Sequence, residues 1–374
     1  MVAPAKMTVA EAMEREWPLL LAVGILAFLV FGNSWISQGL DQPIFLIAIL
    51  VGLCGVILTA AIAIVRHADE LAHRLGEPAG TLLLTLSITG LEVAMVAFVM
   101  STGTPKPTLA RDTMFAVVML VMNGFLGCAL LVGGIRHREQ PYNPQSANAF
   151  LSLIVPLTVL GLVLPNFTQA APGPLLSTFQ MVFLSIMSVG VYSGFLFLQN
   201  QRHRGFFIMP DTSEEPGKTA AHGGMPTAFH GGMLFAYGVP LVLLAKKMSV
   251  PMEAMVLRLG APPALSGLVM AILVLTPESI AAIQAARADQ LQRSINVLLG
   301  SVLASIGLTI PLVIAVSLIT HRPLELGLGP SEMVMLVLTL VTSLLTFTIP
   351  RTNVLSGMVH LLLFAAYLLL LFDR

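Results

Sequence analysis

The chain has 374 residues, of which 56% are hydrophobic and only 10% are charged, and its mean hydropathy is +0.89. Soluble domains carry about 25% charged residues, so this composition excludes that class and predicts an all-α integral membrane protein. The formal net charge of zero gives no reason to expect a nucleic-acid partner. Both cysteines, Cys54 and Cys128, fall in apolar stretches, where we expect neither a disulfide framework nor thiol chemistry.

Apolar segments near the ~20 residues that a bilayer requires follow one another along the chain and predict about eleven transmembrane helices. The stretch before the first segment lacks the apolar region of a cleaved signal peptide, so this helix should remain as an anchor. With the N-terminus in the cytoplasm, twelve Lys and Arg residues lie inside and seven outside, which predicts a cytoplasmic N-terminus and an external C-terminus. The expected spans are 17–36, 43–65, 79–100, 113–135, 149–168, 177–200, 229–245, 261–284, 294–320, 331–348 and 354–372.

A polar stretch at residues 201–228, the longest loop, divides the chain. We expect an N-terminal region with the first helix (1–40), a five-helix repeat (41–200), a cytoplasmic linker (201–228) and a second five-helix repeat (229–374). An odd number of helices in each repeat means that the two repeats insert with opposite orientation. Inverted repeats of this kind are typical of secondary transporters, whose binding site lies near the midplane between them.

Two glutamates stand within otherwise apolar spans, and each lies in the second helix of its repeat: Glu92 and Glu278. A charged side chain at the bilayer centre costs about 3 kcal/mol or more, so intramembrane acids are typical of ion or proton pathways. A glutamate that stays protonated and only hydrogen-bonds a neighbouring helix is the alternative. The matched pair favours a cation-transporting protein.

Residues close in sequence to both glutamates can offer oxygen ligands. Helical spacing places Thr85 and Thr89 on the face of Glu92. Pro277 lacks an N–H group, which should leave the carbonyl of Leu273 without its helical partner. Oxygen ligands suit a hard cation such as Ca²⁺. The predicted ligands around the two acids are Glu92, Glu278, Thr85, Thr89, the carbonyl of Leu273 and Thr276.

The helix that follows each glutamate helix also carries polar side chains. Asn123 lies in the first of these helices, and Ser301 and Ser305 lie in the second. Each could be an ion ligand, but small and polar residues also mediate helix packing in membranes, so both interpretations stay open.

Three further acids precede the first glutamate helix in a predicted cytoplasmic loop. Asp69, Glu70 and Glu77 could form a vestibule that attracts cations. The plainer interpretation is a solvated turn, with Glu77 placed favourably at a helix N-terminus just before Pro78.

Histidines near the central loop and in the last span have two interpretations. His203, His222 and His230 could sense pH or a metal, but their spacing matches no metal-ligand pattern, which favours an ordinary linker. His360 fits helix packing better than a proton relay.

Residues 67–92, ending in Thr89-Gly-Leu-Glu92, resemble the first α-repeat of the calcium/cation antiporter superfamily, particularly the bacterial ChaA-type antiporters. Thr276-Pro-Glu-Ser279 and residues 292–311 resemble the second; the two motif regions span about 67–135 and about 259–320. The resemblance implies a bacterial inner-membrane protein in which the two glutamates take Ca²⁺ or protons. Ala304 stands where the family's second repeat has an amide side chain, which reduces the amide oxygens of the site.

The expected function is exchange of cytoplasmic Ca²⁺, and also Na⁺ or K⁺, for external H⁺ by alternating access, without a prosthetic group. Two carboxylates in one dry site repel, so at least one should hold a proton when no cation is bound. A mainly monovalent Na⁺(K⁺)/H⁺ antiporter of the same fold is the alternative. A membrane enzyme lacks support because neither His-Glu-x-x-His nor Gly-x-Ser-x-Gly occurs, and inverted duplication favours a carrier over a passive channel. The oligomeric state stays open.

Overall fold

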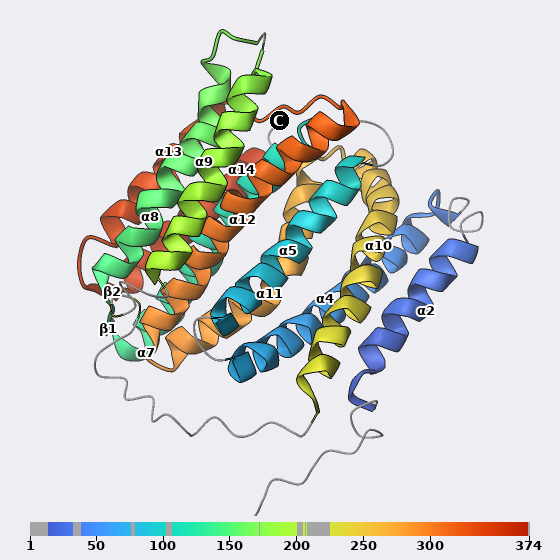
Figure 1. Cartoon of the computed structure of the whole chain (residues 1–374), viewed down its shortest axis with the longest axis horizontal. Coiled ribbons are helices and arrows are strands. Elements are labelled where there is room, and N and C mark those ends of the chain that lie inside the picture. Colours follow the sequence, from blue (N-terminus) through green and yellow to red (C-terminus); the bar gives the residue numbers. More distant parts are fainter. Residues whose placement is uncertain are drawn as a thin grey trace, which may run out of the picture. The chain divides into compact units, whose positions relative to one another are not determined.

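The computed structural model describes residues 14–32, 39–75, 79–101, 107–171, 173–199, 205, 207 and 225–372. These residues are almost all helical, and eight of their helices are long and apolar enough to cross a membrane (Figure 1). Three shorter apolar helices accompany them, Trp17–Phe31, Leu86–Met100 and Pro330–Thr346. Large apolar side chains such as Phe31, Ile44 and Leu257 are more than four-fifths exposed on these helices, which suits contact with lipid. The prediction of a helical membrane protein is therefore confirmed.

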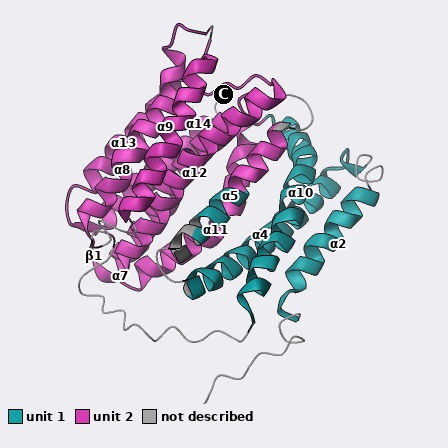
Figure 2. Ribbon diagram, viewed as in Figure 1, with its two compact units in different colours: residues 1–91, 210–260 teal, residues 92–209, 261–374 magenta. Residues whose placement is uncertain are grey.

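The chain forms two compact units (Figure 2). The first unit contains residues 1–91 and 210–260, and the second contains residues 92–209 and 261–374. In the first unit, α4 and α10 pack along each other and α2 packs against both. The helices of this unit are α2 (Trp17–Phe31), α4 (Pro43–Leu75), the first part of α5 (Ala79–Ser101) and α10 (Thr227–Leu259).

Two helices of the first unit extend beyond their predicted ends. α4 continues to Leu75, so Asp69 and Glu70 lie in its last turns, and their placement in a loop was wrong. α10 continues past the predicted end at residue 245 to Leu259, where Gly260 adopts a left-handed conformation (φ 60°) that ends the helix. Hydropathy locates only the part of a helix that suits lipid, whereas backbone hydrogen bonding carries the helix on through charged residues.

The second unit holds the remaining helices, and irregular turns interrupt or extend some of them. The helix Leu109–His137 is formed by α6 (Leu109–Met119), a π-helical turn η1 (Leu120–Phe125) and α7 (Leu126–His137). α8 (Pro144–Thr158) continues through a π-helical turn η2 (Val159–Val163) and a 3₁₀ turn η3 (Leu164–Asn166). The others are α9 (Thr178–Phe197), α11 (Ala264–Arg287), α12 (Leu291–Thr320), α13 (Pro330–Thr346) and α14 (Val354–Phe372).

Helix α12 is the core of the second unit. It packs against α8, α9 and α11, and most of its side chains are buried (Figure 1). Ser188 Oγ on α9 donates a hydrogen bond of 3.0 Å to the carbonyl oxygen of Gly307, which fixes the two helices in register. A helix that is enclosed on several sides can present polar groups that lipid would not tolerate.

A small antiparallel sheet joins two loops of the second unit. β1 (Glu139–Pro141) pairs with β2 (Arg351–Asn353), with Gln140 opposite Thr352. The buried Gln140 side chain donates a 2.8 Å hydrogen bond to the carbonyl oxygen of Ala286, at the end of α11. The ends of α7, α11 and α14 are therefore held together at one level of this unit.

Candidate cation and proton site

Both predicted intramembrane acids belong to the second unit. Glu92 lies in the middle of α5 and is only 4% exposed. Glu278 lies in the middle of α11, directly after Pro277, and is partly buried. A proline inside a helix removes one backbone donor, so the carbonyl of Leu273 lacks its usual partner one turn before the acid.

Two serines of α12 hold the two carboxylates. Ser305 Oγ donates a 2.6 Å hydrogen bond to Glu92 Oε2, and Ser301 Oγ donates a 3.0 Å hydrogen bond to Glu278 Oε2. The serines are four residues apart, so they share one face of the helix and are separated by about 6 Å along its axis. The structure therefore brings Glu92 and Glu278 to the same face of α12.

The charge of this site is not balanced by a fixed cation. The Glu92 carboxylate lies within electrostatic range of Glu278. None of the ion pairs between described residues involves either acid. Their hydrogen-bond donors are neutral hydroxyl groups, so protons or bound cations must compensate the two carboxylates.

Asn123 makes contacts of a different kind. It lies in the π-helical turn η1, where its Nδ2 donates a 2.8 Å hydrogen bond to Thr339 Oγ1 on α13. Its Oδ1 lies 3.2 Å from Nδ1 of His360 on α14, and Nε2 of that ring lies 3.1 Å from Thr346 Oγ1. These are the contacts of the packing alternative for both Asn123 and His360.

The remaining predicted ligands stay predictions. Thr89 is buried one turn before Glu92, and Thr85 lies on the same helix with its side chain outside the described part of the chain. The hydroxyl of Thr276 donates to the carbonyl of Ile272 in its own helix, which leaves its lone pairs available. Hydroxyl oxygens can accept and donate at once.

The acids of the predicted vestibule belong to the first unit or fall outside the description. Glu70 accepts hydrogen bonds of 3.0 and 2.8 Å from Arg74 one turn later, while Asp69 is exposed. Glu77 lies outside the described residues. The vestibule stays a prediction.

Sequence reasoning missed Tyr192 on α9. This residue is 3% exposed, and a Cβ added to Gly307 of α12 would lie 3.3 Å from its side chain. Its hydroxyl has no hydrogen-bond partner among the described residues. It also lies within electrostatic range of Glu278. A tyrosine inside an apolar span is a signal that could have found it, because its polar tip requires a partner.

The donor set suits a hard cation as cargo. No group of three or more His, Cys, Asp or Glu side chains within the described ranges could hold a metal ion. The two acids and their serines instead offer oxygen atoms alone, which Ca²⁺, Na⁺ and K⁺ all accept and softer transition metals do not prefer.

Comparison with known proteins adds a family and a fold. The family model described as sodium/calcium exchanger protein matches residues 44–200 and 230–372. The putative ionic transporter y4hA of Sinorhizobium fredii is 42% identical over 87% of this chain and 88% of its own length. The sodium-potassium/proton antiporter ChaA of Escherichia coli is 37% identical over 96% of each chain. A solved structure of the Ca²⁺/H⁺ antiporter protein YfkE shares the fold, with a TM-score of 0.73 at 16% identity, covering 96% of this chain and all of that one.

Proposed function

The chain belongs to the sodium/calcium exchanger protein family and is a cation/proton antiporter of the calcium/cation antiporter superfamily, and from this premise we propose that Glu92 and Glu278 form its transport site. Ca²⁺ and protons compete there for the two carboxylates, and the protein exchanges cytoplasmic Ca²⁺ for external H⁺. The observation that carries the proposal is the attachment of both acids to one face of α12 through Ser301 and Ser305.

The serine hydroxyls suit both loaded states. With the carboxylates free or partly protonated, each hydroxyl donates its hydrogen to an acid, as seen at 2.6 and 3.0 Å. When a cation enters, the same oxygens can turn a lone pair toward it, because a hydroxyl is both a donor and an acceptor. The tyrosine hydroxyl of Tyr192 and the carbonyl of Leu273 are further candidate oxygens beside Glu278.

Competition for one site couples the two fluxes. Two carboxylates carry a charge of −2, which one Ca²⁺ or two protons neutralise, so cation binding must expel the protons. Exchange of one Ca²⁺ for two protons moves no net charge. A third proton would move one charge, worth about 2.3 kcal/mol per 100 mV of membrane potential.

Alternating access follows from the proposed inverted repeats, residues 41–200 and 229–374. Two features support them: α4 and α10 each have 33 residues and each precedes a glutamate helix. These two helices also pack against each other. We place the protein in the bacterial inner membrane with its N-terminus inside and its C-terminus outside; exchange proceeds as one helix group moves against the other.

A mainly monovalent Na⁺(K⁺)/H⁺ antiporter is the second candidate, and two observations favour it. The Asn123 amide is engaged by Thr339 and His360, and Ala304 supplies no oxygen. The site therefore has few neutral oxygens, whereas Ca²⁺ prefers six to eight. The name of the 37% identical relative also points to monovalent cations.

The test is cation-driven proton flux in proteoliposomes. Glu92→Gln and Glu278→Gln should each reduce exchange at least about 100-fold, because an amide cannot release a proton or neutralise a cation. Glu139→Gln is the control, since this acid is exposed on β1 and pairs only at 3.4 Å with Arg351. Wild-type exchange in either site variant would refute the site.

The same vesicles identify the cation. Proton release on addition of Ca²⁺, Na⁺ or K⁺ separately should be largest for the physiological substrate. Release with Ca²⁺ alone supports the first candidate, and release with only Na⁺ and K⁺ supports the second.

A further inference from the structure

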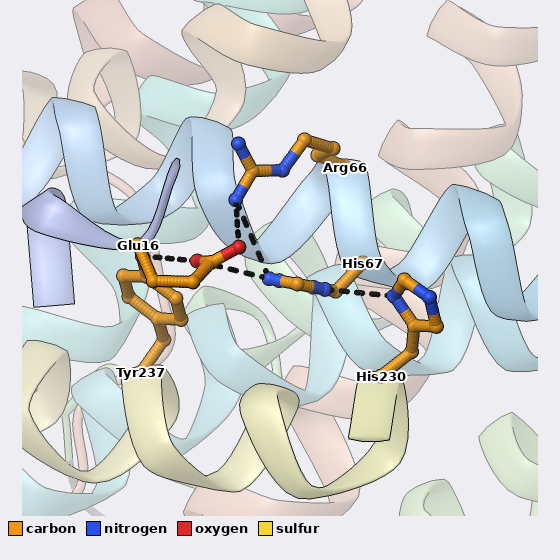
Figure 3. A network of polar contacts seen from close by, with 5 residues as sticks. All are labelled: Glu16, Arg66, His67, His230 and Tyr237. Atoms are coloured by element: carbon orange, nitrogen blue, oxygen red, sulfur yellow. Dashed lines mark hydrogen bonds and ion pairs between the residues drawn. The ribbon is translucent and has the colours of Figure 1, made fainter. Parts of the chain in front are cut away.

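A network of titratable side chains lies in the first unit, apart from the residues of the transport site. It runs from Glu16, at the start of α2, through His67 near the end of α4, to His230 in the first turn of α10 (Figure 3). Nε2 of His67 lies 3.2 Å from Glu16 Oε2, and its Nδ1 lies 2.9 Å from Nδ1 of His230. His67 is only 2% exposed, although it adjoins the charged end of α4. Each imidazole therefore has one ring nitrogen facing the other ring.

Glu16 is fixed as an acceptor. Its Oε1 accepts a 2.7 Å hydrogen bond from Arg66, and its Oε2 accepts a 2.7 Å hydrogen bond from the hydroxyl of the buried Tyr237 (Figure 3). Both of these partners can only donate here, so the Glu16 carboxylate acts as an acceptor on each of its oxygens. Nε2 of His67 lies 3.2 Å from Glu16 Oε2 and 3.4 Å from Nη2 of Arg66. We assign a hydrogen to this nitrogen, because the shorter contact is to an acceptor.

This assignment determines the position of each hydrogen in the contacts that join Glu16, His67 and His230. In the neutral state His67 has its hydrogen on Nε2, so its Nδ1 accepts the hydrogen of His230 Nδ1. His230 Nε2 then has a free lone pair, and this atom is buried with no hydrogen-bond partner among the described residues. Within this network, the lone pair on His230 Nε2 is the one position that can take up a proton without breaking a hydrogen bond.

One proton can enter, and the charge can move. When a proton binds His230 Nε2, the Nδ1 hydrogen of His230 can pass across 2.9 Å to Nδ1 of His67. His230 is then neutral again, and His67 is an imidazolium that donates to both Glu16 and His230. A second proton would place two positive rings with hydrogens on both facing nitrogens, which removes the bond between them.

The charged side chains around the two histidines carry no net charge. The charged groups near the pair are Glu16 at the start of α2 together with Arg66, Glu70 and Arg74 of α4, and the neighbouring titratable group of α10 is Tyr237. The two acids and two arginines balance each other. Burial opposes a positive charge on His67, the direct contact with Glu16 favours one, and the contact between the rings opposes a second.

We propose that Glu16, His67 and His230 form a second proton-binding site, separate from the transport carboxylates, that takes up one proton through His230 and holds it on His67. In its loaded state this site ties the starts of α2 and α10 to α4 through charge-assisted hydrogen bonds. It thereby couples the attachment of the N-terminal helix to the pH at this end of the first unit.

Proton uptake tests the site without requiring transport. Purified protein carrying Glu92→Gln and Glu278→Gln, which removes the transport carboxylates, is titrated from about pH 8 to about pH 5, the range in which imidazole changes charge. Adding His67→Gln and His230→Gln together should lower the uptake by about one proton per chain. Adding either substitution alone should leave the uptake nearly unchanged, because the remaining histidine takes the proton.

His321→Asn is the matched control. His321 is exposed after α12 and has a left-handed conformation (φ 53°) that asparagine tolerates. Its uptake curve shows how much of any change comes from removing a histidine that lies outside the pair. A loss of two protons in the double variant, or of none, would overturn the proposal.

A second measurement avoids substituting the pair, in case those variants fold poorly. Nitrogen NMR of labelled histidine rings in the Glu92→Gln, Glu278→Gln protein should show His67 gaining a hydrogen on its second ring nitrogen while His230 stays neutral. Both rings becoming imidazolium in this pH range, or neither, would refute the shared proton.

Discussion

Two long helices of the second unit each follow a glutamate helix, and they use their polar residues differently. α12 is an unbroken helix whose Ser301 and Ser305 donate to the two acids. The helix Leu109–His137 contains a π-helical turn, and the amide of Asn123 in that turn contacts α13 and α14 instead. A polar residue at a comparable place in the sequence thus serves the ion site in one helix and helix packing in the other, because the neighbouring helices differ.

The packing around the two helices differs in the same way. A Cβ on Gly357 of α14 would lie 2.5 Å from the backbone nitrogen of Leu131 on α7, so these two helices are in backbone contact. A Cβ on Gly300 of α12 would meet only the ring of Phe150, at 3.6 Å. The Leu109–His137 helix is a tightly packed structural element, whereas the ion-site helix has ordinary side-chain contacts at this glycine.

The largest expected effect comes from closing the tight contact. Gly357→Ala should lower the free energy of unfolding by about 3 kcal/mol, because the clashing atoms are backbone and cannot rotate away. Thermal unfolding in detergent measures it. A melting temperature equal to that of the wild type would show that α7 and α14 are not closely packed.

The next effect separates the serines of α12. Ser305→Ala should slow exchange about 10- to 100-fold, because a hydrogen bond to a charged group contributes about 1.5–3 kcal/mol. Ser294→Ala on the same helix is the control, since its buried hydroxyl has no partner within the described residues. Equal exchange in both variants would remove α12 from the transport site.

Asn123→Ala tests the opposite role. The substitution leaves Thr339 and His360 without their shared partner, which should cost about 1–3 kcal/mol of stability. Exchange by the protein that remains folded, normalised to that fraction, should keep its cation affinity. An unchanged melting temperature with lost affinity would instead make Asn123 an ion ligand.

The smallest effect is expected at Gly300. Gly300→Ala adds a side chain in ordinary van der Waals contact and should stabilise the helix by about 0.5–1 kcal/mol. Flux and thermal unfolding measured on the same preparation check it. A strong loss of exchange would show that α12 must come closer to α8 during transport than it does in this structure.

Some predictions needed only the local composition and motifs of the sequence. The helical membrane class and the family followed from composition and from the two glutamate motifs, and both are confirmed. The prediction of a loop at Asp69 and Glu70 was wrong because hydropathy falls where charge begins, while the helix continues through these residues to Leu75. The π-helical turn around Asn123 has no marker such as proline in its own sequence.

The sequence by itself determined that two acids lie within apolar helices, since a carboxylate in such a stretch is visible without any neighbour. Only the tertiary structure decided which groups meet them: Ser301 and Ser305 face the acids, while Asn123 faces Thr339 and His360. It also decided that Glu16, His67 and His230 contact one another in a single network, although 214 positions separate the first from the last. Partners across helices depend on the rotation and packing of each helix, and one-dimensional periodicity leaves these undetermined.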